Sequence, residues 1–322
     1  MIRNCLLVLG LLLWNACAFA QVYPSHSIVL VVPFAAGGPN DVLARIVTAH
    51  MSQTLGVPIV IENVTGAGGT IGSERAAEAT PDGYTILSGN LGTHAASYTY
   101  YSELKYRPDD FAAVGMVAAT PNFLAVRKEF PANTLQEFID YAKKNPGKVT
   151  AGHAGNGSNG NLVCLLLMNT ANIQLQLVPY RGSGPALNDL MANQIDAMCD
   201  SAPTVVPQAR AGGIRALVVA QPHRIDRLPN VPTSAEAGLP GFEVAGWNAF
   251  FAPKNTPDGV VVRLNQALST ALADPGVRQR ITDIGADVPP PTERTREWLD
   301  SFVKTEIQKW DPIVRASGVA IK

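Results

Sequence analysis

The stretch Val32–Asp41, VPFAAGGPND, decides the fold class of this chain. It follows the apolar run SIVLV and precedes VLARIVTAHM, in which apolar residues recur at helical spacing. A strand of apolar residues that enters a glycine pair and then a helix predicts a β-turn-α unit of a parallel sheet. The N–H groups of Gly37 and Gly38 would stand at the helix N-terminus, a position that favours an anion.

The residues after the glycine pair support a helix over Pro39–Leu55. Proline is suited to the first helical position, and Asp41 is suited to the positive N-terminal end. Leu43, Val47 and Met51 recur at i, i+4 and i+8 and mark the face that packs on the core. We expect Asp41 to have a structural role rather than to contact a ligand.

Alternating strand and helix patterns continue along most of the chain and predict parallel sheets with helices on both faces. The stretches 111–120 and 123–128 are expected to form two separate strands. Two stretches, 117–126 and 219–238, are expected to carry the chain between two α/β lobes, with hinges near Ala119–Phe123 and Pro229–Gly241.

The composition is that of an ordinary soluble protein, and the length allows two lobes. The chain has 322 residues, of which 47% are hydrophobic and 16% charged, with a net charge of −1, so no basic surface for nucleic acid is expected. Residues 1–20 have an apolar core followed by Ala18-Phe19-Ala20, which predicts a cleaved signal peptide. A lipoprotein acylated at Cys17 is the alternative.

Two cysteines remain in the chain after this cleavage, Cys164 and Cys199. Both could be buried thiols, and in an exported protein they could also form one disulfide. Neither belongs to a CxxC motif, and the histidines form no HExxH pair, so no metal site is expected.

The candidate motifs for catalysis or nucleotide binding all have the wrong spacing. TGAGGTIG at 65–72 lacks the G-x-G-x-x-G spacing, and no Walker A motif occurs. Ser158 and Ser183 are flanked by glycines, but neither stands in G-x-S-x-G. No catalytic residue and no cofactor is therefore expected.

Four loops rich in Gly, Ser, Asn or Thr follow predicted strands, at 34–40, 88–97, 152–160 and 180–186. The carboxyl ends of parallel strands form the ligand-binding edge of such sheets. Polar, uncharged loops at this edge favour binding over catalysis.

Several longer motifs resemble the Bug, or TctC-like, family of extracytoplasmic solute receptors. They are VPFAAGGPNDVLAR, VIENVTGAGGTIGSERAAEATPDGYTIL, VPYRGSGPALNDLMANQIDAMCD, RALVVAQPHRIDRLPNVPTSAEAG and WNAFFAPKNTPDGVVVRLNQAL, in this order over nearly the whole mature chain.

This resemblance implies a two-domain periplasmic-binding-protein (Venus-flytrap) α/β fold, with 21–120 plus 242–322 as domain 1 and 121–241 as domain 2. It implies a periplasmic, monomeric receptor, not an enzyme, which captures a small organic carboxylate between the domains. The receptor would deliver this ligand to the membrane permease subunits of a tripartite tricarboxylate transporter. A secreted α/β hydrolase, or a receptor that feeds a sensor kinase, remains an alternative.

The polar loops and the resemblance together give the residues expected at the ligand. The carboxylate is expected over Gly37 and Gly38, and Arg181 is expected to pair either with the ligand or with Asp200. The expected ligand-binding residues are Phe34, Ala36, Gly37, Gly38, Asn40, Asn90, Thr93, His94, His153, Gly157, Ser158, Asn159, Arg181 and Asp200.

Overall fold

The apolar run before the glycine pair forms the strand β1 (Ile28–Val32), which is buried on both faces, as its composition predicts. The computed structural model describes residues 23–316. Strand β1 pairs in parallel with β2 (Ile59–Asn63) and β3 (Thr85–Asn90). Leu30 packs in the core on one face of this sheet and Val31 in the core on the other.

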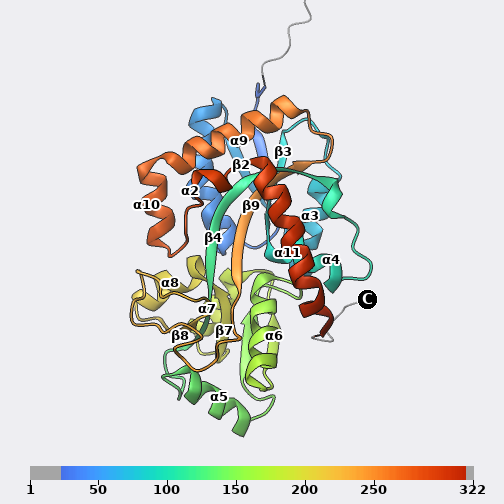
Figure 1. Ribbon diagram of the computed structural model, residues 1–322. Coiled ribbons are helices and arrows are strands. Elements are labelled where there is room, and N and C mark those ends of the chain that lie inside the picture. The colour runs from blue at the N-terminus through green and yellow to red at the C-terminus, as the bar shows by residue number, and fades with distance from the viewer. Residues whose placement is uncertain (1–22, 317–322) are drawn as a thin grey trace, which may run out of the picture.

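Two long strands connect the domains (Figure 1). Strand β4 (Phe111–Arg127) pairs with the antiparallel β9 (Ala245–Pro253) as far as Pro121, and from Asn122 onward it pairs with strands of the second domain. The expectation of two separate strands is therefore wrong. The predicted crossing near Ala119–Phe123 is confirmed.

The second crossing lies closer to the C-terminus than predicted. It occurs at the start of β9, where the N–H of Val244 donates to the carbonyl of Ala220 and Ala245 lies opposite Pro121. Residues 221–241 contain no strand and return to the second domain through a bridge between Val219 and Thr233. Four prolines in this segment have no N–H to donate to a β-ladder. The chain therefore forms its second crossing strand from the apolar residues that follow.

The second sheet has the order β8-β4-β7-β5-β6. Its strands are β5 (Thr150–His153), β6 (Gln176–Pro179), β7 (Ala197–Ser201) and β8 (Ile214–Val219). Strands β5, β6 and β7 are parallel, as predicted, whereas β4 runs antiparallel to β7 and β8. The sheets are thus mixed, because the crossing strands enter and leave them in opposite directions.

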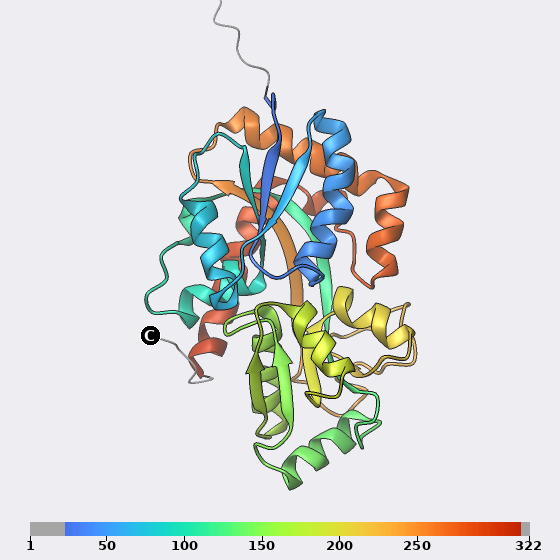
Figure 2. The ribbon, with the colours of Figure 1, turned by 180° about the vertical axis from the view of Figure 1, so that it is seen from behind.

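Helices cover both faces of each sheet (Figure 2). The first domain has α2 (Pro39–Leu55), α3 (Thr70–Ala77), α4 (Ser97–Tyr100), α9 (Asp258–Ala273), α10 (Pro275–Asp283) and α11 (Arg296–Ala316). The second has α5 (Leu135–Lys144), α6 (Asn159–Ala171), α7 (Ser183–Met191) and α8 (Ala202–Arg210). Short helical turns are η1 (Ala67–Gly69), η2 (Gly92–Ala96), η3 (Pro108–Asp110) and η4 (Pro291–Glu293).

Three apolar cores result from this layering. Helices α2, α9 and α10 cover one face of the first sheet, and α7 and α8 cover one face of the second. The remaining core joins α11 of the first domain with α5 and α6 of the second. The predicted signal peptide and Cys17 lie outside the described residues. Within residues 23–316, no helix has both the length and the apolar character needed to cross a membrane.

Candidate ligand-binding cleft

The first loop, which joins β1 to α2, already carries an anion of its own. Gly37 has φ +81°, and its N–H donates to Asp41 Oδ2 at 3.0 Å. The same carboxylate accepts from Arg45 and from Asn63 Nδ2. Burial opposes ionisation of Asp41, but these hydrogen bonds outweigh it and lower the pKa of the carboxyl. Asp41 is therefore structural, and Gly37 does not offer its N–H to a ligand.

A cavity lies between the two domains, next to this loop. About 370 Å³ of space, including its mouth, is free of protein atoms there. The residues around it come from both domains and from both crossing strands. They are Phe34, Pro39, Asn40, Asn90, Thr120, Ala154, Ser158, Asn159, Gly160, Ser183, Asp200, Ser201, Trp247 and Asn248.

Four helices begin at this cavity. Pro39 opens α2, Asn159 opens α6, Ser183 opens α7, and Ser201 is the N-cap residue of α8. Each helix N-terminus presents N–H groups without an intrahelical partner and a partial positive charge. Of the described residues that line the cavity, Asp200 is the one with an ionisable side chain. The arrangement can hold an anion by helix dipoles and backbone amides, without a Lys or Arg.

The wall formed by the first domain is internally hydrogen-bonded. Asn40 Nδ2 donates to the carbonyl of Ser88 at 3.2 Å, and Asn90 Nδ2 donates to Asn40 Oδ1 at 3.1 Å. Asn90 Oδ1 in turn accepts from the N–H of Thr93. These amide side chains therefore have fixed orientations before any ligand arrives.

The wall formed by the second domain leaves acceptors open. Asn159 Nδ2 donates to Asn122 Oδ1 at 2.6 Å, but Asn159 Oδ1 has no partner. Asp200 Oδ1 accepts from the N–H of Ser201 at 2.7 Å, while Asp200 Oδ2 has none. Burial raises the pKa of Asp200 to about 6, and donation from Ser201 to Oδ1 opposes this rise only in part.

Six of the fourteen predicted residues line this cavity: Phe34, Asn40, Asn90, Ser158, Asn159 and Asp200. Gly38 and Gly157 are buried beside it, and Thr93 supports Asn90 from behind. Ala36 and Gly37 are exposed.

Three further predicted residues lie away from the cavity. Arg181 is exposed, forms no ion pair with an acid among the described residues, and lines a separate outer groove. His94 is buried in the first domain, stacked on Phe251 at a ring distance of 4.0 Å. His153 is buried beneath Ala154, the neighbour that does reach the cavity. Burial lowers the pKa of His94 to about 3 and that of His153 to about 4, so both rings are neutral.

Sequence reasoning missed the contribution of the crossing strands. Thr120 on β4 and Trp247 and Asn248 on β9 all line the cavity. The signal was a polar residue within an otherwise apolar strand, as in GWNAFF, where Asn248 is only 3% exposed. A buried amide in such a strand needs a hydrogen-bond partner, and a ligand in the cavity could be that partner.

The two domains touch around the mouth of the cavity. Tyr101 Oη lies 2.6 Å from the carbonyl oxygen of Asn156 across the gap and 3.0 Å from that of Ala67 in its own domain. On the other side, the N–H of Ala35 donates to the carbonyl of Arg181 at 3.2 Å. These contacts describe a closed arrangement of the domains.

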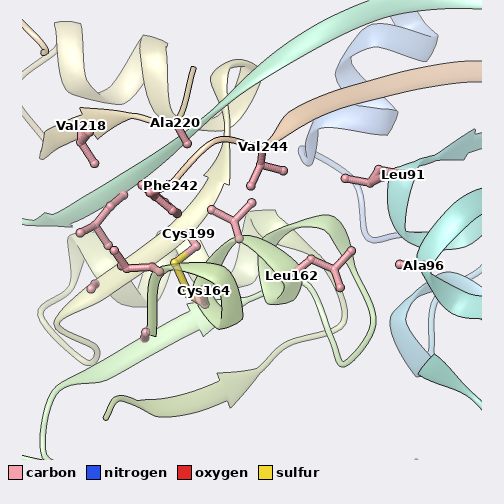
Figure 3. Packing of buried hydrophobic residues seen from close by; sticks show 14 of the residues in the cluster. Leu91, Ala96, Leu162, Cys164, Cys199, Val218, Ala220, Phe242 and Val244 are labelled. Carbon is pink, nitrogen blue, oxygen red and sulfur yellow. A yellow bond between two sulfur atoms is a disulfide. The ribbon is translucent and has the colours of Figure 1, made fainter. Parts of the chain in front are cut away.

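A disulfide joins two elements of the second-domain wall. Cys164 on α6 is bonded to Cys199 on β7, with 5.5 Å between their Cα atoms, in the buried core beside Leu162 and Phe242 (Figure 3). The bond thus resolves the choice between thiols and disulfide that the sequence leaves open. It ties the helix that carries Asn159 to the strand that carries Asp200. Among the described residues, no cluster of three His, Cys, Asp or Glu could hold a metal.

Comparisons with known proteins agree with this geometry. The structure of MatC from Rhodopseudomonas palustris with bound malate is 44% identical, covers 91% of this chain and 100% of its own, and superposes with a TM-score of 0.88. The periplasmic binding protein BugD is 38% identical, with 93% and 100% coverage and a TM-score of 0.90. An R. palustris protein solved with adipate is 34% identical, with 92% and 99% coverage and a TM-score of 0.88.

The family model described as the tripartite tricarboxylate transporter family receptor matches residues 43–319. Its solved relatives are two-domain binding proteins, which confirms the predicted fold class. The chain therefore belongs to the TctC, or Bug, family of tripartite tricarboxylate transporter receptors.

Proposed function

We propose that this protein is a periplasmic solute receptor that binds a small organic carboxylate between its domains. It would deliver this ligand to the membrane subunits of a tripartite tricarboxylate-type transporter. The observation that carries the proposal is the convergence of the N-termini of α2, α6, α7 and α8 on a cavity that lacks a cationic side chain among its described residues.

The relatives narrow the ligand class. MatC is solved with malate and another relative with adipate, both dicarboxylates with four to six carbons. The N-terminus of α2 in the first domain would hold one end of such a molecule, and the N-termini of α6, α7 and α8 in the second domain would hold the other end. We propose that residues 21–120 with 242–322 form one moving domain and residues 121–241 the other. The mature chain, after removal of residues 1–20, would act as a monomer.

The first test is binding by protein stripped of carried ligand through unfolding and refolding. Calorimetry with mono-, di- and tricarboxylates of three to six carbons should find at least one acid that binds and that mass spectrometry recovers unchanged. Conversion of the acid would instead favour an enzyme, and no binding by any acid would overturn the proposal.

A substitution at Ser158 tests the site itself. Ser158 is the N-cap of α6, accepts from the N–H of Asn161 at 3.3 Å, and is 1% exposed at the cavity. Ser158→Asp keeps a good helix cap but places a carboxylate where the ligand anion is expected, so affinity should fall by about 10-fold or more.

Thr134→Asp is the matched control, because Thr134 caps α5 away from the cavity through the same kind of bond at 3.1 Å. This variant should bind as the unsubstituted protein does. Equal affinity of both variants would place the ligand elsewhere.

A further inference from the structure

Three buried oxygen atoms at the cavity accept no hydrogen bond. They are Asn159 Oδ1, Asp200 Oδ2 and Asn248 Oδ1. Asp200 and Asn248 are each 3% exposed, so solvent does not reach these side chains freely. A buried polar atom without a partner costs free energy, and binding sites are where such atoms gain partners from a ligand.

A carboxylate group cannot satisfy these atoms, because it carries only acceptors at neutral pH. The helix N-termini provide donors for the ligand anion, whereas these three oxygens require donors from the ligand. The lining of the cavity therefore offers both hydrogen-bond donors, at the helix N-termini, and hydrogen-bond acceptors, at these three oxygens.

Of the three residues, Asp200 gives the clearest evidence for an acceptor site. Both of its carboxylate atoms are oxygens, whereas the acceptor of an asparagine depends on the orientation of its amide. The N–H of Ser201 fixes Oδ1 and leaves Oδ2 open. An ionised Asp200 would repel the carboxylate of a simple acid, and an O–H or N–H group of the ligand would offset this repulsion.

We propose that the cleft selects carboxylic acids that also carry an O–H or N–H donor on their carbon chain, and that Asp200 accepts this donor. This inference rests on the proposed function. Asp200 is then the specificity-determining residue, while the helix N-termini supply the general affinity for carboxylates. A hydroxy acid and an amino acid share the required chemistry, and the experiment separates them.

The test compares sets of acids with the same carbon skeleton by calorimetry. Suitable sets are succinate, malate and aspartate; glutarate, 2-hydroxyglutarate and glutamate; and adipate, 2-hydroxyadipate and 2-aminoadipate. In at least one set, a substituted acid should bind the unsubstituted protein about 10- to 100-fold more tightly than its parent, as expected for a hydrogen bond to a charged group.

The variant Asp200→Asn keeps the shape of the side chain and an oxygen for Ser201, but replaces the open acceptor by a donor. Its preference for the substituted acid should fall to near unity, with a larger loss for an ammonium than for a hydroxyl group. Asp140→Asn, on the exposed face of α5, makes the same charge change in the same domain and should leave the preference intact.

The possible outcomes are distinct. If parent acids bind the unsubstituted protein as tightly as their substituted forms, the inference is wrong while the proposed function stands. This comparison needs no variant, so it holds even where Asp200→Asn fails to fold. A preference that survives in Asp200→Asn would overturn the role of Asp200, and no binding by any acid would overturn both proposals.

Discussion

The two walls of the cleft differ in how their polar groups are satisfied. In the first domain, Asn40 and Asn90 form hydrogen bonds with each other and with backbone groups. The carboxylate of Asp41 accepts the hydrogen bond that the N–H of Gly37 donates. In the second domain, Asn159 and Asp200 each leave an acceptor open, and the third open acceptor at the cavity, Asn248 Oδ1, lies on the crossing strand β9. The difference indicates that the first wall is a preformed support and that the second wall distinguishes one ligand from another.

The second wall also depends on a covalent link that the first wall lacks among its described residues. The disulfide spans 35 positions, and closing a loop of this length is expected to contribute up to about 4 kcal/mol to the free energy of unfolding. The double variant Cys164→Ala, Cys199→Ala should lower the free energy of unfolding by about 2–4 kcal/mol in chemical denaturation.

Hydrogen exchange would show where this stability is lost. Protection in the double variant should fall mainly in α6 and β7, while the loop at 34–40 keeps its protection. Loss spread evenly over both domains would contradict the view that the bond supports one wall in particular.

A second prediction concerns the pH dependence of stability caused by Asp200. Because burial raises its pKa from 3.8 in the unfolded chain to about 6, the native state binds more protons than the unfolded state between pH 4 and 6. Stability from this group is present below pH 4 and is lost as the pH rises through 6. By pH 7.5 the loss amounts to about 3 kcal/mol.

Asp200→Asn removes this loss, so the ligand-free variant should be more stable than the unsubstituted protein at pH 7.5 and equal to it at pH 4. Thermal melting of both proteins over this range measures the difference. The neutral His94 and His153 titrate with the opposite sign, but they are common to both proteins and cancel. A difference in melting temperature that stays constant with pH would show that Asp200 is not the cause.

The third prediction tests the first wall. Asp41→Ala would remove the acceptor of the Gly37 N–H and one of the two acceptors of Asn63 Nδ2, which also donates to the carbonyl of Phe34, at a cost of about 1–2 kcal/mol in the free energy of unfolding. Arg45→Met is the control, since the Arg45 side chain is 55% exposed and its ion pair should be worth less than about 1 kcal/mol. Equal losses in the two variants would mean that the ion pair, not the loop, is what Asp41 stabilises.

The sequence predicted the layout of the fold better than the details of the site. The spacing of Leu43, Val47 and Met51 and the flanking Pro39 placed α2 correctly, because these signals are local. The unbroken β4 was missed because Pro121 reads as a strand end. In the structure, Pro121 is the last residue of β4 that pairs with β9, and the residues after it pair with strands of the second domain.

The site residues were harder to predict because burial is a property of the whole fold. His94 and His153 lie among glycines and small polar residues, yet packing from distant strands and helices buries both rings. Asp41 lies four residues after Gly37, so its competition with a ligand for the N–H of Gly37 is local in sequence. Whether the carboxylate of Asp41 points toward that N–H depends on Asn63, which comes from another strand. Asn248 becomes a site residue only because β9 crosses between the domains.

The smallest expected effect concerns closure of the two walls on each other. The hydroxyl of Tyr101 can donate to Asn156 only when the domains meet, but Ala67 in its own domain offers a second acceptor at 3.0 Å. Opening therefore leaves the hydroxyl with a partner, and Tyr101→Phe should disfavour the closed state by no more than about 1 kcal/mol, or about fivefold in ligand affinity. Calorimetry measures this change, and Tyr141→Phe on α5 is a control with the same chemistry away from the mouth.

Ligand should still make Tyr101→Phe more compact in solution scattering. It should also still protect the loops 34–40 and 153–160 together in hydrogen exchange, because the ligand itself favours closure. Protection confined to one of these loops in the unsubstituted protein would contradict closure of the two walls around a shared ligand.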